Sequence, residues 1–334
     1  MKRIVMGISF VLLVAAASVL PGRAQDAATA AANPSEQPPT HNWAAGNPLK
    51  IAQLKWYQAN QTTSFIVGKT QNSNPYGVAF DGENIWTANS GENTVTKLRA
   101  SDGTNLGTFH TGNLPTGVTF DGANVWISNS SDNTVTKLRA SDGKNLGTFN
   151  VGKYPFWMAF DGEALWVANF DDGTVTKLRT SDGKTLGTFT VGGAPIAVAF
   201  DGTYIWVSLF SNQVARLKKD GSNAGSFTVG DQPLGLAFDG ANIWVANETV
   251  GTVTKLRASD GKTLGTFHVE GSPYGVVFDG SNVWVTVGIA VAELRASDGK
   301  LLGYAHANGG STGLAFDGAN VWVALGLSNI VFKF

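Results

Sequence analysis

Tryptophan recurs along this chain at a nearly constant interval. Seven of its ten tryptophans lie 40, 40, 40, 38, 40 and 38 residues apart, and each ends the phrase Phe-Asp-Gly-x-x-(Ile/Val/Leu)-Trp. They are Trp86, Trp126, Trp166, Trp206, Trp244, Trp284 and Trp322. Such a period is typical of repeat proteins, in which each unit buries its faces only against its neighbours. The repeat therefore constrains the fold more strongly than the length of 334 residues does.

One unit, residues 75–112, predicts four strands. Apolar residues 75–80 and 85–88 indicate two buried strands, and Asp81-Gly82 between them supplies the positive φ angles of a tight turn. A polar loop leads to residues 94–99, and a second Asp-Gly turn precedes residues 106–111. Seven such units predict an all-β fold, a seven-bladed β-propeller of four-stranded blades. The repeated tryptophan is expected to pack between blades.

The two ends of the chain are complementary. The last unit stops after its third strand, at residues 330–334, and lacks a fourth. Residues 64–68, Ser-Phe-Ile-Val-Gly, match Thr-Phe-His-Thr-Gly at 108–112 in the first unit. We therefore expect an N-terminal strand to complete the last blade, which closes the ring and leaves no open sheet edge there. Residues 51–55 would duplicate the third strand of that blade, and the sequence does not place them.

The N-terminus predicts export. Lys2 and Arg3 precede a mostly apolar run at 4–20, and Gly22 and Ala24 are small residues before a cut after Ala24. An uncleaved membrane anchor is the alternative, although the run is short for a spanning helix. The expected organisation is a signal peptide at 1–24, a flexible tether at 25–49 and the propeller at 50–334. We expect a secreted or periplasmic protein with no membrane span after signal removal.

The overall charge argues against a nucleic-acid partner. Lys and Arg number 24 against 25 Asp and Glu, a formal net charge of −1. A protein that binds the phosphate backbone of nucleic acids needs an excess of Lys and Arg over Asp and Glu. The repeated Lys and Arg of the third strands, such as Lys97 and Arg99, are interpreted as outer-strand charges that keep exposed edges soluble. The chain has no cysteine, so neither disulfides nor a thiol nucleophile are expected.

The repeat resembles known propeller families. The segments Thr-Val-Thr-Lys-Leu-Arg at 174–179, Gly-Thr-Phe-Thr-Val-Gly at 187–192 and Phe-Asp-Gly-x-x-Ile-Trp at 200–206 look like the YVTN-type repeat. They are also similar to repeats of streptogramin (virginiamycin B) lyases and to NHL repeats, over residues 50–334. For the lyases the resemblance implies a histidine and carboxylates around a magnesium ion at the mouth of the propeller.

The histidines do not match that implied site. His110, His268 and His306 share one register on the outermost strand, which places them on the rim, and His41 lies in the tether. No catalytic residue is therefore carried over from the lyases, and no other catalytic constellation is identified.

The variable positions predict the functional face. The two Asp-Gly turns barely change between units and lie on one face of a propeller. The crossings between blades and the loops after the second strands, on the other face, vary freely. Since loops on a rigid scaffold carry binding, the predicted ligand-binding residues lie there. They are Tyr76, Glu92, Asp132, Phe156, Trp157, Phe170, Asp171, Asp172, Phe210 and Tyr274.

Aromatic rings beside carboxylates indicate an amphipathic ligand, such as a sugar, a peptide or a ligand that carries a cation. A merely solvated loop set is the alternative. The four acids also raise the possibility of a divalent cation held by oxygen ligands; no other cofactor is expected. Asn89, Asn129, Asn169 and Asn247, which end second strands, are interpreted as makers of local turn hydrogen bonds.

The main hypothesis is an exported module that binds a small molecule, a glycan or an envelope protein through its variable face. The alternative is a metal-assisted lyase or lactonase-like enzyme related to streptogramin lyases. A structural surface protein without a small-molecule site is a third hypothesis.

Overall fold

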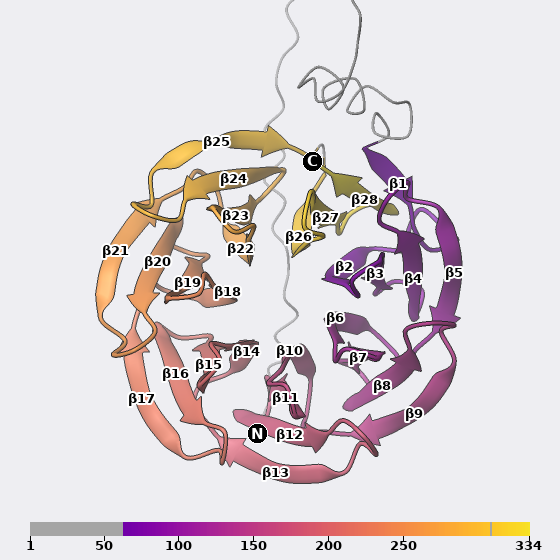
Figure 1. Ribbon diagram of the computed structural model, residues 1–334, viewed down its shortest axis with the longest axis horizontal. Helices are drawn as coiled ribbons and strands as arrows, with labels where there is room; N and C mark the ends of the chain where they lie inside the picture. The colour runs from indigo at the N-terminus through magenta and orange to yellow at the C-terminus, as the bar shows by residue number, and fades with distance from the viewer. Residues whose placement is uncertain (1–62, 308) are drawn as a thin grey trace, which may run out of the picture. The chain divides into compact units, whose positions relative to one another are not determined.

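The computed structural model describes residues 63–307 and 309–334, which form seven antiparallel four-stranded sheets arranged as the blades of a ring (Figure 1). The seven-bladed all-β propeller predicted from the tryptophan period is confirmed. Each blade runs from an innermost strand beside the axis to an outermost strand on the rim. Blade 1 is β2–β5, and blade 7 consists of β26, β27, β28 and β1.

Strands at equivalent positions begin and end at equivalent residues of the repeat, except that β27, β28 and β1 of blade 7 are shorter. The innermost strands are β2 (Pro75–Phe80), β6 (Pro115–Phe120), β10 (Pro155–Phe160), β14 (Pro195–Phe200), β18 (Pro233–Phe238), β22 (Pro273–Phe278) and β26 (Ser311–Phe316). The second strands are β3 (Asn84–Asn89), β7 (Asn124–Asn129), β11 (Ala164–Asn169), β15 (Tyr204–Leu209), β19 (Asn242–Asn247), β23 (Asn282–Val287) and β27 (Val321–Leu325). The third strands are β4 (Thr94–Arg99), β8 (Thr134–Arg139), β12 (Thr174–Arg179), β16 (Gln213–Lys218), β20 (Thr252–Arg257), β24 (Ala290–Arg295) and β28 (Ile330–Lys333). The outermost strands are β5 (Asn105–His110), β9 (Asn145–Asn150), β13 (Thr185–Thr190), β17 (Asn223–Thr228), β21 (Thr263–His268), β25 (Leu301–His306) and β1 (Ser64–Ile66).

The ring is closed by the N-terminal strand, as predicted. In β1, Phe65 lies opposite Val331 of β28. Two further backbone bonds extend the pairing, from Val67 N–H to Asn329 O at 2.8 Å and from Lys333 N–H to Thr63 O at 2.7 Å. The free edge of β28 is thereby covered.

Several predicted segments lie outside the described residues: the signal peptide at 1–24, the tether at 25–49, and the duplicate strand at 51–55. The part of the chain that the structure describes contains no helix long and apolar enough to cross a membrane.

The repeated phrase has one structural explanation in all seven blades. In blade 3, Asp161 Oδ1 accepts the backbone N–H groups of Glu163 and Ala164, and Asp161 Oδ2 accepts the indole N–H of Trp166 at 2.9 Å. The same indole bond recurs in each other blade, at 2.7 Å. Of the Asp-Gly pair only the glycine adopts a positive φ, 90° at Gly162. The turn and the tryptophan are thus fastened by one carboxylate.

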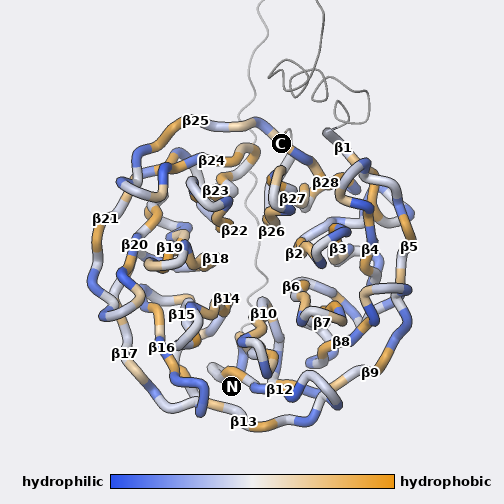
Figure 2. The backbone as a smooth tube through the Cα atoms, viewed as in Figure 1, coloured by the Kyte–Doolittle hydropathy of each residue, from blue (hydrophilic) through white to orange (hydrophobic). Residues whose placement is uncertain are grey.

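The tryptophans form the core between blades. Trp126 of blade 2 is fully buried and lies in one hydrophobic cluster with Met158, Leu165 and Leu178 of blade 3. Hydrophobic residues recur along the strands of every blade, whereas hydrophilic segments lie at the turns between the outer strands (Figure 2). Each blade therefore buries its faces against its neighbours, as the period predicts.

The interpretation of the third-strand lysines as exposed charges is wrong. Lys97 is only 7% exposed. Its Nζ lies 5.3 Å from the centre of the Trp86 ring and donates a 2.7 Å hydrogen bond to Ala140 O of the next blade. Equivalent cations cover the tryptophans of blades 2, 3, 4, 5 and 7. The arginines two residues on are exposed, as predicted, and Arg99 pairs with Asp102 at 3.0 Å.

Replacing the buried cation is expected to destabilise the protein more than replacing the exposed one. Lys97→Ala leaves Ala140 O without this donor and opens space over Trp86, so we expect a loss of about 1–3 kcal/mol in the free energy of unfolding. Arg99→Ala removes only a solvent-exposed pair and should change it by less than about 0.5 kcal/mol. Urea denaturation followed by tryptophan fluorescence measures both; equal effects would contradict the assignment.

Candidate functional site

Every innermost strand carries a β-bulge where it meets the variable face. In β10, Pro155 pairs with Asn169 and Met158 pairs with Val167, so two residues, Phe156 and Trp157, lie opposite one. The same shift occurs in the other six blades. A bulge changes the direction in which side chains point. The two bulge residues of each blade therefore decide what surrounds the axis at this face, which we call the mouth.

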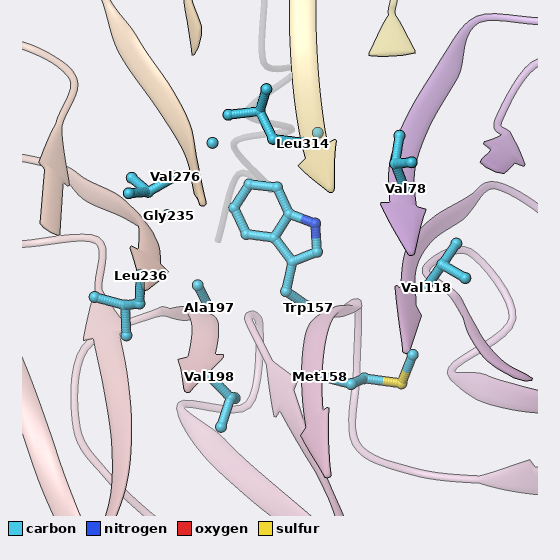
Figure 3. A pocket seen from close by; sticks show the side chains of 12 residues that line it. Val78, Val118, Trp157, Met158, Ala197, Val198, Gly235, Leu236, Val276 and Leu314 are labelled. Carbon is cyan, nitrogen blue, oxygen red and sulfur yellow. The ribbon is translucent and has the colours of Figure 1, made fainter. Parts of the chain in front are cut away.

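Trp157 is the exception in the second bulge position. The equivalent residues of the other blades are small: Gly77, Gly117, Ala197, Gly235, Gly275 and Gly313. Several glycines are required by close backbone approach, since a Cβ on Gly77 would lie 2.2 Å from Thr116 O and one on Gly313 would lie 2.4 Å from Tyr76 O. The small ring leaves room at the axis, and the Trp157 indole lies at its centre (Figure 3).

The axial cavity around this indole measures about 170 Å³. Each blade contributes one aliphatic or thioether side chain to its wall: Val78, Val118, Met158, Val198, Leu236, Val276 and Leu314. These side chains carry no charge, so the side-chain wall of this cavity, as far as residues 63–307 and 309–334 form it, is apolar.

Six predicted residues come together with Tyr154, which was not predicted, in what we call the aromatic mouth cluster. The six are Tyr76, Phe156, Trp157, Phe170, Phe210 and Tyr274. The Trp157 ring lies 5.3 Å from that of Tyr274 and 6.5 Å from that of Tyr76, measured between centroids. The hydroxyls of Tyr76 and Tyr274 are hydrogen-bonded to each other. Burial raises the pKa of the Tyr76 hydroxyl, so this group stays neutral. Residues of blades 1, 3 and 6 therefore meet across the axis.

The cluster extends from the axis to the rim of the mouth. Phe156 is buried with Ile196 and Leu234 beneath the other rings. Phe170 lies 6.5 Å from Phe156 and 5.8 Å from Phe210, which is 37% exposed. The result is an apolar surface with a buried base and an open edge, the arrangement expected of a binding face.

Tyr154 belongs to this cluster and was missed from the sequence. Its ring lies 6.0 Å from that of Phe156 and 6.2 Å from that of Phe170. Its φ is 52°, an uncommon conformation for a residue with a large side chain. Its position beside Pro155, Phe156 and Trp157 was visible in the sequence, but the backbone angle that directs it toward the cluster was not.

The predicted acidic residues do not join the cluster as a group. Asp132 accepts the backbone N–H of Asn113 at 2.7 Å, and Asp172 accepts that of Lys153 at 2.7 Å. Asp171 is exposed on the rim. Within the described residues no three carboxylate, imidazole or thiol side chains gather where they could hold a metal ion. The divalent-cation site considered from the sequence therefore has no set of side-chain ligands here.

Glu92 is likewise engaged in its own crossing. Its carboxylate accepts the backbone N–H groups of Lys69 and Thr70 and the hydroxyl of Ser73. Partial burial raises the pKa of Glu92, but the hydrogen bonds from Thr70, Lys69 and Ser73 together hold it below its ordinary value. These bonds fasten the crossing from blade 7 to blade 1.

Glu248 is the acid that sequence reasoning missed. It follows β19 at the position that holds Phe170 in blade 3 and Phe210 in blade 4. Partial burial raises the pKa of its carboxyl, and its charge acts on Tyr76. The comparison between repeats could have found it, because only blade 5 has a carboxylate in this register.

Of two minor interpretations, the first is confirmed and the second only in part. His110, His268 and His306 end β5, β21 and β25 and are exposed on the outer rim. Asn129 has a structural role, as interpreted, but its bonds are not those of a local turn: it accepts Gly112 N–H of the crossing at 3.0 Å and donates to Thr136 Oγ1 of β8 at 2.9 Å.

Solved structures share this fold. Hydrazine synthase of Kuenenia stuttgartiensis aligns with a TM-score of 0.69 at 18% identity, over 80% of this chain and 97% of that one. A streptogramin B lyase aligns with a TM-score of 0.71 at 17% identity, over 81% and 96%. Virginiamycin B lyase from Staphylococcus aureus aligns with a TM-score of 0.71 at 16% identity, over 81% and 97%.

No protein-family profile and no curated protein sequence matches the chain. At such low identities a structural likeness establishes the fold, and the chemistry has to be argued from the site. The resemblance to streptogramin (virginiamycin B) lyase propellers expected from the repeats is thus confirmed as a similarity of fold.

Proposed function

We propose that this protein is a binding module whose ligand docks on the aromatic mouth cluster. The observation that carries the proposal is the asymmetry between the two faces. One face repeats the same Asp–Trp turn in all seven blades. The other gathers aromatic side chains from blades 1, 3, 4 and 6 around one point. Packing between blades explains the first pattern and does not require the second.

Partial exposure of the cluster supports this function. Phe170 and Tyr274 are half-buried, and Phe210 is more exposed. Rings that are held by neighbours and reach solvent lose little conformational entropy when a ligand covers them. The proposed ligand is a small molecule, a glycan or a peptide with an apolar part. Export to the periplasm or the medium, and a partner in the cell envelope, remain predictions.

Ligand screening on a mouth variant tests this function. Binders are identified by the rise in the melting temperature of the wild-type protein. The panel consists of mono- and oligosaccharides, short peptides and organic cations. We expect the double variant Phe170→Ala/Phe210→Ala to weaken each binder by about tenfold or more, because aromatic anchors dominate such interfaces. The matched control, Leu106→Ala/Leu146→Ala, removes two exposed apolar side chains of the outer rim. A panel without binders, or binders that are insensitive to the mouth variant, would contradict the proposal.

A further inference from the structure

Glu248 is the one acidic residue at a position that recurs in all seven blades. The residue four places after the repeated tryptophan is Ser90, Ser130, Phe170, Phe210, Glu248, Gly288 or Gly326. Its backbone is held alike in the blades: Glu248 N–H donates to Gln232 O at 3.0 Å, and Ser130 N–H donates to Leu114 O at 3.0 Å. The equivalence is therefore structural as well as sequential.

The serines at this position show where the side chain points. Ser90 Oγ donates to Pro115 O and Ser130 Oγ donates to Pro155 O, both at 2.6 Å, on the innermost strand of the next blade. By the same geometry Glu248 faces the start of β22, where Tyr274 follows Pro273. A carboxylate cannot donate to a carbonyl as serine does. Glu248 therefore cannot make the bond that the serines make to the innermost strand of the next blade.

Glu248 differs from the other acids of the mouth. Glu92, Asp132 and Asp172 each accept backbone N–H groups of their own crossing. Among the described residues no donor bonds to the Asp171 carboxylate either, but Asp171 is exposed to solvent, whereas Glu248 is partly buried. In residues 63–307 and 309–334, no donor bonds to the Glu248 carboxylate and no cationic side chain pairs with it. A carboxylate that is partly removed from water without gaining a partner is costly. An approaching positive charge would offset that cost.

Aromatic rings lie on the same side. After burial and Tyr154, the negative charge of Glu248 also raises the pKa of the Tyr76 hydroxyl. The Tyr76 hydroxyl is hydrogen-bonded to the hydroxyl of Tyr274. Trp157 lies 5.3 Å from Tyr274. The faces of such rings attract weakly hydrated organic cations, whereas Mg²⁺ or Ca²⁺ requires several oxygen ligands. Three rings that lie together, with one carboxylate whose charge acts on Tyr76, match the first class of ion.

We propose that the mouth recognises an organic ammonium group, with Glu248 as its counter-charge and Tyr76, Trp157 and Tyr274 as its aromatic wall. The proposal rests on the proposed function, since it names the ligand chemistry of the same surface. It goes further by committing to a positive charge and to one acid that neutralises it.

A pair of isosteric probes tests the charge directly. Choline and its uncharged analogue 3,3-dimethylbutan-1-ol have similar shapes, and sodium chloride equalises the ionic strength. The readout is the NMR shift of the Trp157 indole N–H, assigned by its absence in Trp157→Phe. We expect saturable binding of choline and binding at least about tenfold weaker for the alcohol.

Two carboxylate variants locate the counter-charge. Glu248→Gln keeps the shape and should weaken choline about tenfold or more while leaving the alcohol unchanged. Asp231→Asn removes an exposed charge from the neighbouring crossing and should change neither. Circular dichroism confirms that both variants are folded.

Each other outcome overturns the proposal in a distinguishable way. Equal binding of choline and the alcohol refutes charge recognition while the proposed function stands. Choline binding that Glu248→Gln does not weaken refutes the counter-charge. No saturable shift at about 100 mM choline, above the millimolar range expected of one such group, refutes the ammonium site. If the ligand panel also yields no binder, the proposed function fails with it.

Discussion

Phe65→Ala is expected to destabilise the propeller by about 3–5 kcal/mol. Phe65 is 7% exposed, and its ring lies 5.2 Å from that of Trp322. It is also the central residue of β1, the three-residue strand that completes blade 7. Its truncation leaves a cavity where the two ends of the described chain meet, and it weakens the cover over the edge of β28. Urea denaturation measures the loss.

The next residue provides the matched control. Ile66 belongs to the same strand, but its side chain is 68% exposed. Ile66→Ala should therefore change the free energy of unfolding by less than about 0.5 kcal/mol. Because stability in a repeat protein is transmitted between neighbours, Phe65→Ala should also broaden the unfolding transition. If Phe65→Ala and Ile66→Ala unfolded at the same urea concentration, ring closure by this segment would be refuted.

The closing strand was predictable because the repeat provides its own template. Phe109 in blade 1 packs on Trp86 at 5.6 Å, and Phe65 packs on Trp322 at 5.2 Å. The sequence similarity between residues 64–68 and 108–112 therefore reflects the same packing of a phenylalanine on the tryptophan of its own blade. The same argument explains why blade number and strand order followed from the tryptophan period alone.

The lysines show where this reasoning fails. Alternation along a strand places Lys97 and Arg99 on the same face, so they received the same interpretation. Lys97 lies opposite Trp86 in the regular pairing of β3 with β4, whereas Arg99 ends β4 opposite Asn84. The partner of Lys97, the carbonyl of Ala140, belongs to the next blade. Neither the residue opposite Lys97 nor a contact between blades is visible in the pattern of one strand.

The candidate site was predicted in part for the right physical reason. Departure from the repeat identified Phe156, Trp157 and Phe170, because packing between blades does not require aromatic side chains at those positions. That Trp157 reaches the axis depends on the bulge in β10, which alternation does not show. The acids were chosen by charge alone, yet Asp132 and Glu92 satisfy backbone N–H groups of their own crossings. Glu248, which is partly buried and has no such bond in the described part of the chain, was not chosen.

Trp126→Ala is expected to cost about 3–5 kcal/mol, because a fully buried indole between blades 2 and 3 is removed. Trp126→Phe separates ring burial from the polar bond. It keeps most of the apolar area but leaves Asp121 Oδ2 without the indole donor that lies 2.7 Å away. We expect this variant to lose about 1–3 kcal/mol.

A double-mutant cycle isolates that bond. Asp121→Asn preserves the oxygen that accepts the turn N–H groups of Ala123 and Asn124. It also turns an amide N–H₂ toward the indole N–H, and two donors repel. Once phenylalanine replaces Trp126 this conflict disappears, so the double variant should be more stable than the sum of the single effects predicts. Strict additivity would mean that the Asp–Trp bond contributes nothing, and that burial alone accounts for the stability the repeated phrase provides.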